Sequence, residues 1–437
     1  MTIVLITFLF VLLMTIFIGT PVAFALGFVA VGTTLLFISP SHLTQIGSIV
    51  YSQGINMNQL VAPLFILMAE ALAHGGIAKD IFEVINKWLR RVKGGLALSA
   101  TFASTVFAAL CGSSPATAAA IGRISIKEMI ERGYREEFAT GVVAAGGTLG
   151  IMIPPSISLI IYGIITENSI AQLFIAGIIP GLLTSGLLCL YIVSVVKIKP
   201  SLVEQMPFNK NEVQSTPERE SNSLHDLKLI TPPMLLILGV LGSLYTGFAT
   251  PTEAAGFGSI GALLFVLILG RFNINFISNV VSATARTSSM IIFMIFGGMA
   301  LSYVVSYLGL TQFIANLIVD SGLSKWVIVL LIYVLWFILG ALMDPLSMVV
   351  LTIPFIYPTM IALGFDPLWL GIVSTLAVEI GMITPPVGLN LFVLKSITDV
   401  PMNKIMSGSL PFVFVLIFSL LIITVFPQIV LFLPSNM

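Results

Sequence analysis

Two stretches, Gly150-Ile-Met-Ile-Pro154-Pro155 and Gly381-Met-Ile-Thr-Pro385-Pro386, interrupt long apolar segments with the same pattern and lie 231 residues apart (381 − 150). Glycine and paired prolines free backbone N–H and C=O groups from helical hydrogen bonds. Inside a bilayer, such backbone is tolerated only where it is buried in protein or lines a wet cavity. A break made twice therefore predicts a duplicated, interrupted membrane helix and a binding site near the middle of the membrane.

The composition is that of a multi-pass membrane protein. Of 437 residues, 57% are hydrophobic and 9% are charged, which excludes an ordinary soluble domain of this length. The 19 basic and 19 acidic side chains cancel, so no surface for nucleic acid is indicated and the lipid bilayer is the expected surrounding. Cys111 and Cys189 have no metal-ligand spacing, and we expect neither a zinc site nor a cofactor.

The first half of the chain, 1–197, is predicted to form one repeat. Its central apolar run is broken at Cys111-Gly-Ser-Ser-Pro115 and has charged flanks. Arms of roughly 15 residues reach about 22 Å, less than the ~30 Å hydrocarbon core, so this run is read as a hairpin that enters and leaves on one side. The expected parts are scaffold helices within 1–77 (near 1–19, 21–38 and 50–77), a surface arm at 79–93, the hairpin at 94–137, the broken helix at 138–165 and a spanning helix at 171–197.

The second half is predicted to repeat the first after a polar cytoplasmic linker at 198–228. Its expected parts within 229–397 are scaffold helices over 229–306 (near 229–248, 252–270 and 286–306), an arm at 308–324, a hairpin at 326–357 and a broken helix at 366–397, and a helix at 408–433 then closes the chain.

Further landmarks keep the same register. Gly19-Thr20-Pro21 corresponds to Ala249-Thr250-Pro251, and Pro115 corresponds to Pro345, at an offset of 230 (345 − 115). Landmarks within one residue of a constant offset indicate internal duplication.

Lys and Arg predict the orientation. Eighteen of the 19 basic residues fall in segments that this layout places on one side, and Lys325 alone falls on the other. The side rich in basic residues faces the cytoplasm. The first hairpin then opens from the cytoplasm and the second from outside, so the expected fold is an all-α polytopic membrane protein of two inverted repeats.

The tips and breaks offer free helix ends, where N–H groups suit anions and carbonyls suit cations. We expect two sodium sites, each made by one tip and one break: Ser113, Ser114, Gly150, Ile153 and Pro155 for the first, and Gly340, Gly381, Thr384 and Val387 for the second. Residues expected to contact substrate are Thr117, Pro154, Asp344, Pro385 and Asn390.

Each of these residues also has a packing alternative, because Ser, Thr and Gly are common at contacts between membrane helices. Asp344 is ionisable at membrane depth, where a charge costs ~2.5–3.5 kcal/mol on insertion scales. It is either functional or the cap of a helix with Pro345 at its first position. Asn390 either faces the cavity or packs as an amide.

This layout also predicts that three glutamates, Glu70, Glu253 and Glu379, are buried. Glu253 lies three residues after Thr250 and matches a capping pattern, so we expect it to be structural. Glu379, two residues before Gly381, is the better functional candidate. Glu70 has no assigned role.

Three motifs, Cys111-Gly-Ser-Ser-Pro-Ala-Thr-Ala-Ala-Ala-Ile-Gly122, Gly146-Gly-Thr-Leu-Gly-Ile-Met-Ile-Pro-Pro-Ser156 and Glu379-Ile-Gly-Met-Ile-Thr-Pro-Pro-Val-Gly-Leu-Asn390, together resemble the large membrane subunit of tripartite ATP-independent periplasmic (TRAP) transporters. The resemblance runs nearly end to end. It implies an elevator-type transporter of the bacterial inner membrane, with Na⁺ as the coupling ion. It also implies an obligate small membrane subunit of about four helices, a transient periplasmic substrate-binding protein, and an organic acid such as sialic acid or a C4-dicarboxylate as cargo.

Other functions remain as alternatives. A single-component divalent-anion/sodium symporter shares inverted repeats and hairpins, although the Ser-Asn-Thr tips of such proteins are missing. An intramembrane protease is disfavoured, because Asp344 has no Gly-x-Gly-Asp setting or partner Asp, and Ser113 has no Gly-x-Ser-Gly setting. A passive channel also fits a membrane protein with a central cavity. A phosphate-binding Gly-rich loop with Lys is not found, so ATP is not expected to drive transport.

Overall fold

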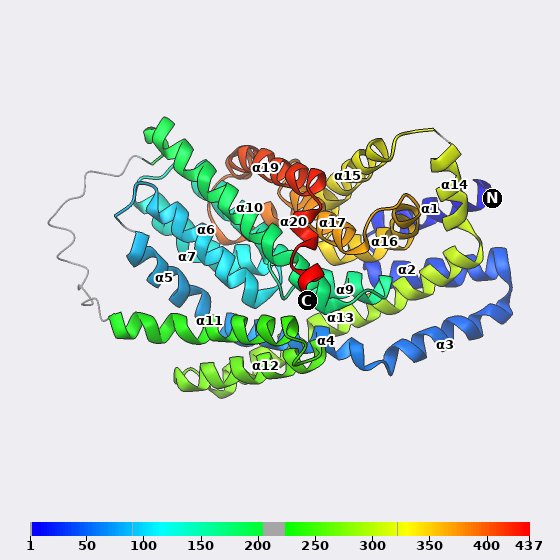
Figure 1. The fold of residues 1–437 in the computed structure, drawn as a ribbon, viewed down its shortest axis with the longest axis horizontal. Helices are drawn as coiled ribbons and strands as arrows, with labels where there is room; N and C mark the ends of the chain where they lie inside the picture. The colour runs from blue at the N-terminus through cyan, green and yellow to red at the C-terminus, as the bar shows by residue number, and fades with distance from the viewer. Residues whose placement is uncertain (1, 90, 204–222, 321) are drawn as a thin grey trace.

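The computed structural model describes residues 2–89, 91–203, 223–320 and 322–437, and this part of the chain is almost entirely helical (Figure 1). Within it, nine helices are long and apolar enough to cross a membrane. The prediction of an all-α, multi-pass fold is confirmed. Most of the predicted linker 198–228 lies outside the described residues. The described part of the chain resumes at Ser223, where α11 begins.

The helices of the first half follow the predicted order. The scaffold helices and the first arm are α1 (Thr2–Phe17), α2 (Val22–Thr33), α3 (Leu43–Gly54), α4 (Val61–His74) and α5 (Ile77–Leu89). The hairpin, the broken helix and the following span are α6 (Gly95–Cys111), α7 (Ser114–Glu131), α8 (Glu136–Met152), α9 (Ile157–Thr166) and α10 (Ile170–Ile198).

The second half repeats this order. Its scaffold helices and arm are α11 (Ser223–Tyr245), α12 (Pro251–Ile268), α13 (Ile274–Tyr307) and α14 (Leu310–Asp320). The hairpin, the broken helix and the closing helices are α15 (Lys325–Leu342), α16 (Pro345–Ala362), α17 (Pro367–Met382), α18 (Leu389–Ile397), α19 (Met402–Val425) and α20 (Gln428–Leu431).

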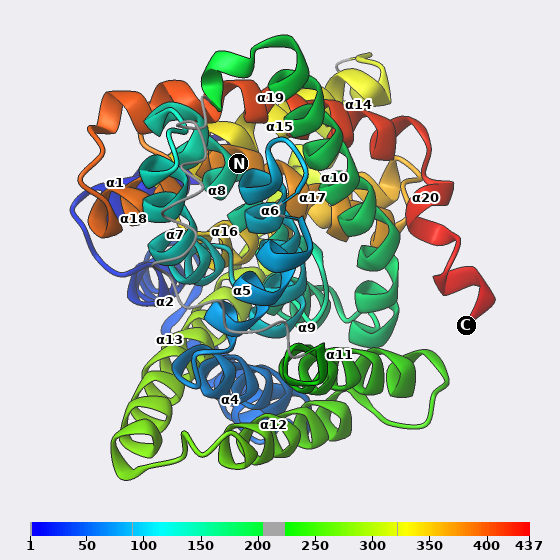
Figure 2. The ribbon, with the colours of Figure 1, turned by 90° about the vertical axis from the view of Figure 1, so that its left-hand side faces the viewer.

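The helices are arranged in layers. Figures 1 and 2 show α4, α11, α12 and α13 along one side of the molecule and α10, α15 and α19 along the other. Helices α6–α9, α16 and α17 lie between these layers, where α8 packs against α6, α7 and α19, and α17 packs against α15, α16 and α19. The central helices are therefore enclosed by protein, and nearly nine tenths (89%) of the most apolar window in the broken helix Glu136–Thr166 is buried.

Two scaffold predictions were wrong in detail. The helix expected near 50–77 is divided, because α3 ends at Gly54, Met57–Leu60 forms a short 3-10 turn and α4 starts at Val61. The Asn56 side chain accepts a hydrogen bond from the Asn58 N–H, a local bond that competes with the helix. The helix expected near 286–306 is much longer, since α13 starts at Ile274 behind the cap of Asn273.

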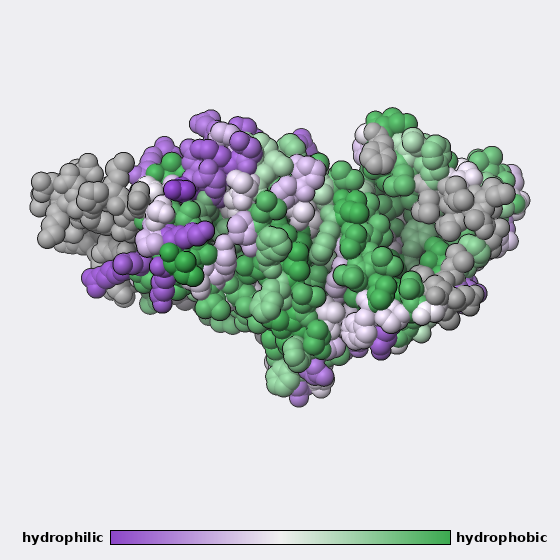
Figure 3. Space-filling view, turned by 90° about the horizontal axis from the view of Figure 1, so that it is seen from above, coloured by the Kyte–Doolittle hydropathy of each residue, from purple (hydrophilic) through white to green (hydrophobic). Residues whose placement is uncertain are grey.

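Polar groups gather at one end of the molecule. Figure 3 shows hydrophilic side chains at the end that carries α5, α7 and the end of α10 in Figure 1, whereas the middle of this face is apolar. We predict that this end faces the cytoplasm. Lys325, predicted to be outside, is exposed beside two aromatic rings: its Nζ lies 5.7 Å from the ring centre of Trp326 and 5.4 Å from that of Phe365.

Candidate functional site

The first hairpin turns within two residues. Gly112 adopts a positive φ of 63° at the end of α6, a conformation that glycine takes without strain. Ser113 is extended and precedes α7, which carries Pro115 in its first turn, where a missing N–H costs nothing. The Thr117 hydroxyl donates to the Ser113 carbonyl at 2.8 Å.

The first break contacts this tip directly. The Ile157 N–H at the start of α9 donates to the Gly112 carbonyl at 3.4 Å. A Cβ on Gly150 would lie 2.6 Å from the Ser113 carbonyl oxygen and 2.8 Å from the Thr117 hydroxyl, and a Cβ on Gly112 would lie 2.5 Å from the Pro155 carbonyl oxygen. Glycine is therefore required on both sides of the contact. The structure brings most of the residues predicted for the first sodium site together.

The second hairpin turns in a different way. Met343 and Asp344 are extended, and the Asp344 carboxylate accepts hydrogen bonds from the Leu346 and Ser347 N–H groups at 3.1 and 3.0 Å, and another from the Ser347 hydroxyl. Of the two alternatives for Asp344, the cap of α16 is the one observed. Both of its carboxylate oxygens are engaged in this cap.

The second break contacts the second tip through glycines. A Cβ on Gly381 would lie 2.7 Å from the Gly340 Cα, and a Cβ on Gly340 would lie 2.8 Å from the Val378 carbonyl oxygen. The Gly388 N–H donates to the Ala341 carbonyl at 3.1 Å. Thr384 donates from its N–H to the Gly381 carbonyl at 3.1 Å and from its hydroxyl to the Ile380 carbonyl at 2.5 Å.

The two tip–break contacts are related by the repeat. Ile157 and Gly388, which donate to the tips, are 231 residues apart (388 − 157), the offset of the Gly/Pro-Pro breaks. Each Pro-Pro peptide bond is cis. A hydrogen bond from the start of the second half-helix to a tip carbonyl is thus present in both halves, as expected for duplicated units.

The two breaks differ in exposure. Residues 151–160 of the first break are all buried, whereas Thr384, Pro385 and Val387 of the second are partly exposed and Pro386 is exposed. A cavity of about 410 Å³ lies beside the second break, between the second tip and the α1–α2 connection, and its lining includes Thr20, Asp344 and Val387. The predicted substrate residues are therefore divided: Asp344 lines this cavity, Pro385 is partly exposed nearby, and Pro154, Thr117 and Asn390 are buried.

A hydrogen-bonded chain connects the two repeats. The Ser114 hydroxyl donates to Glu379 Oε2 at 2.8 Å and accepts from Asn390 Nδ2 at 2.7 Å. All three side chains are fully buried. The sequence singled out each residue but did not predict their contact. Ser114 is separated from Glu379 by 265 residues and from Asn390 by 276 residues, and no sequence pattern pairs residues so far apart.

The other two glutamates have local partners. Glu253 is exposed, so the expectation that it is buried was wrong, and it forms a capping box with Thr250 at the start of α12. Glu70 lies 3.5 Å from His74 Nε2 on the same face of α4. Among the described residues, neither carboxylate forms a hydrogen bond or an ion pair with a residue of a tip or a break.

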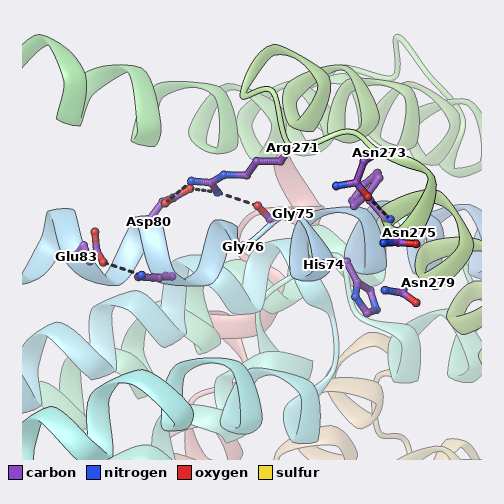
Figure 4. Close-up of a pocket in the computed structure, with 11 residues that line it drawn as sticks. His74, Gly75, Gly76, Asp80, Glu83, Arg271, Asn273, Asn275 and Asn279 are labelled. Carbon is purple, nitrogen blue, oxygen red and sulfur yellow. Dashed lines mark hydrogen bonds and ion pairs between the residues drawn. The ribbon is translucent and has the colours of Figure 1, made fainter.

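A polar pocket of about 660 Å³ lies away from the tips, at the turn between α4 and α5 (Figure 4). Arg271, from the α12–α13 connection, donates to both Asp80 oxygens at 2.5 and 3.0 Å and to the Gly75 carbonyl at 2.8 Å. Figure 4 shows this pair spanning from the arm to the connection. Its charges are paired, so the pocket fixes the first arm to the scaffold.

The fold and the site define a multi-pass membrane protein whose two halves each contain a hairpin and a broken helix, and its relatives are transport proteins and not enzymes. A family model described as "Tripartite ATP-independent periplasmic transporter, DctM component" matches residues 8–429. The chain belongs to this family, whose members are integral proteins of the bacterial inner membrane.

Named relatives extend this result. The chain is 35% identical over 403 residues to the C4-dicarboxylate TRAP transporter large permease protein DctM of Pseudomonas aeruginosa, covering 92% of each chain. It is 31% identical over 423 residues to the sialic acid TRAP transporter large permease protein SiaM of Vibrio cholerae, covering 96% of each. The solved structure of MtrF from Neisseria gonorrhoeae is similar with a TM-score of 0.61 at 14% identity, covering 89% of this chain and 84% of that one, and shows the fold alone.

Proposed function

We propose that this chain carries out sodium-coupled secondary uptake of an organic acid, with sialic acid or a C4-dicarboxylate as the cargo. The observation that carries the proposal is the close approach of each hairpin tip to one broken helix, made at Gly150 in the first repeat and at Gly381 in the second. Both contacts place backbone carbonyl oxygens beside helix ends, and oxygen ligands of this kind suit hard cations. The two named relatives support the cargo class.

The movement that we propose is an elevator. The hairpins and broken helices, α6–α9 and α15–α18, carry the cargo and sodium across together, because they pack on one another and share the buried chain from Ser114 to Glu379 and Asn390. The helices α1–α4 and α11–α13 stay in place as the scaffold. The arms α5 and α14 join the two parts.

Sodium and cargo raise each other's affinity in this proposal. Sodium bound between a tip and a break holds the two together, and the cargo then meets an ordered site; by linkage, bound cargo strengthens sodium binding to the same extent. An inward sodium gradient drives uptake on this basis without ATP.

The proposed partners are those of a tripartite system. One is a small membrane subunit of about four helices, required for stable insertion and full transport, and the other is a periplasmic protein that delivers the cargo. The described residues provide the duplicated unit of hairpins, breaks and scaffold, and family membership supports the two further components.

Uptake into proteoliposomes tests the proposal. Vesicles containing this chain, with or without its small partner, receive labelled sialic acid or succinate, and binding protein and an inward sodium gradient are each added or withheld. Uptake that requires both supports the proposal. Sodium-driven uptake without binding protein identifies a single-component symporter, uptake without saturation or coupling identifies a channel, and full uptake by the chain alone contradicts the obligate subunit.

A further inference from the structure

The inter-repeat link, defined as the hydrogen-bonded side chains of Ser114, Glu379 and Asn390, joins the first tip to the second broken helix. Ser114 is the first residue of α7, while Glu379 lies near the end of α17 and Asn390 near the start of α18. The two bonds to its hydroxyl measure 2.8 and 2.7 Å. One hydroxyl therefore touches both halves of the second broken helix.

The link is buried, and its carboxyl and amide oxygens have no alternative hydrogen-bond partner among the described residues. All three side chains have no exposed surface. Among the described residues, Glu379 Oε1 and Asn390 Oδ1 have no hydrogen-bond partner. A buried carboxyl and a buried amide that each depend on one hydroxyl are left unsatisfied when that hydroxyl moves away, which is unfavourable at low dielectric. The first tip is thereby held in register with the second break.

The ends of the link lie next to the two tip–break contacts. Ser114 follows Ser113, whose carbonyl oxygen lies against Gly150. Glu379 precedes Gly381 by two residues on α17, and Gly381 packs on Gly340 of the second tip. A displacement at either contact is transmitted to the other through three side chains.

Resting on the sodium sites of the proposed function, we propose that the inter-repeat link couples them, so that a cation at one site raises the affinity of the other. Ser114, which the sequence led us to expect as a sodium ligand, acts in this proposal as a positioning residue, because its hydroxyl is bonded to Glu379 and Asn390. Its hydroxyl donates its one hydrogen bond to Glu379 and accepts one from Asn390 on one of its two lone pairs. Both of these hydrogen bonds are made with side chains of the other repeat.

The test measures binding of ²²Na⁺ to the full-length chain, purified together with its small membrane subunit, as a function of sodium concentration. The variants are Ser114→Ala and Asn390→Ala, and the matched control is Ser125→Ala. Ser125 is a fully buried serine of the same helix whose hydroxyl bonds only within α7, to the Ile121 carbonyl. Thermal unfolding of each variant is recorded in parallel.

Two coupled sites give a Hill coefficient that approaches about 2 in the wild type and in Ser125→Ala. We expect Ser114→Ala and Asn390→Ala still to bind the wild-type number of ions at saturation, with the coefficient reduced toward about 1. A merely structural role lowers the unfolding temperature and leaves the coefficient unchanged.

Each other outcome is decisive. An unchanged coefficient in Ser114→Ala overturns the link, as does a coefficient of 1 in the wild type. Loss of one bound ion in Ser114→Ala also overturns it, because Ser114 is then a cation ligand and not a positioning residue. A wild-type chain that binds no sodium contradicts the proposed function itself, which separates the two failures.

Discussion

Substitution of Gly381 by alanine tests the tip–break contact of the second repeat. The added Cβ would lie 2.7 Å from the Gly340 Cα and 3.0 Å from the carbonyl oxygens of Trp336 and Phe337, whereas ordinary contacts begin at 3.4 Å. All three neighbours are backbone atoms of α15, so no side chain can rotate to make room. The tip and the break have to separate by about 0.7 Å (3.4 − 2.7).

This displacement is large for an ion site, since ligand distances are held within about 0.2 Å. Overpacking of this kind costs about 1–3 kcal/mol. If the cost falls on the closed, ion-bound arrangement, sodium affinity decreases about 5- to 150-fold. Sodium-dependent uptake in proteoliposomes measures this as a rise in the sodium concentration for half-maximal rate, and thermal unfolding with and without sodium gives the stability change.

Gly186→Ala is the matched control, because a Cβ on Gly186 of α10 meets no atom within 4 Å. We expect it to leave sodium dependence unchanged and to raise stability slightly, as alanine favours a helix over glycine. If Gly381→Ala has the same sodium dependence and stability as Gly186→Ala, the tip–break contact does not control ion binding and the reasoning is wrong.

Three further tests, on helix caps and one ion pair, have defined outcomes. Asp344→Ala and Asp366→Ala each remove a helix cap, so both lower the free energy of unfolding by about 0.5–2 kcal/mol in thermal unfolding. Only Asp344→Ala, at the second tip, reduces uptake. Equal uptake by the two variants argues against a role for the tip. Arg271→Ala leaves the buried Asp80 carboxylate without its partner, so the double variant with Asp80→Ala unfolds at a higher temperature than Arg271→Ala alone, and the opposite order excludes a stabilising pair. Thr250→Ala breaks the capping box of α12 and costs about 0.5–2 kcal/mol in unfolding experiments with unchanged uptake, a result that slower uptake would contradict.

The duplicated breaks were predictable because Gly and Pro-Pro act locally on the backbone. The hairpin expected at 94–137 corresponds to α6 and α7, and that at 326–357 to α15 and α16. Only the end of α3, from residue 50, fell within a predicted helix, because its sequence, Leu43–Gly54, mixes Thr, Gln, Ser and Gly with apolar residues. Hydropathy finds segments that match the membrane, and α3 is held by tertiary contact with α13.

The residues of the candidate site could be predicted from the sequence, but the contacts between them could not. Ser114, Glu379 and Asn390 were each singled out from motifs, but the bonds between them depend on how the two repeats pack. The same holds for Gly381, where the motif indicates a break and only the structure shows the Gly340 backbone against it. The pairing of Arg271 with Asp80 had no signal beyond opposite charge, because the two residues lie 191 positions apart.

Cys111, the last residue of α6, gives the first tip its own chemical reporter. It is 5% exposed, whereas Cys189 on α10 is partly exposed. Alkylation requires the thiolate, which burial disfavours, so Cys111 reacts with a thiol reagent only when the tip opens to water. The rate of alkylation at Cys111 then reports how often the tip opens, so that the effect of ions and cargo on this opening can be followed in the native sequence, without any introduced label.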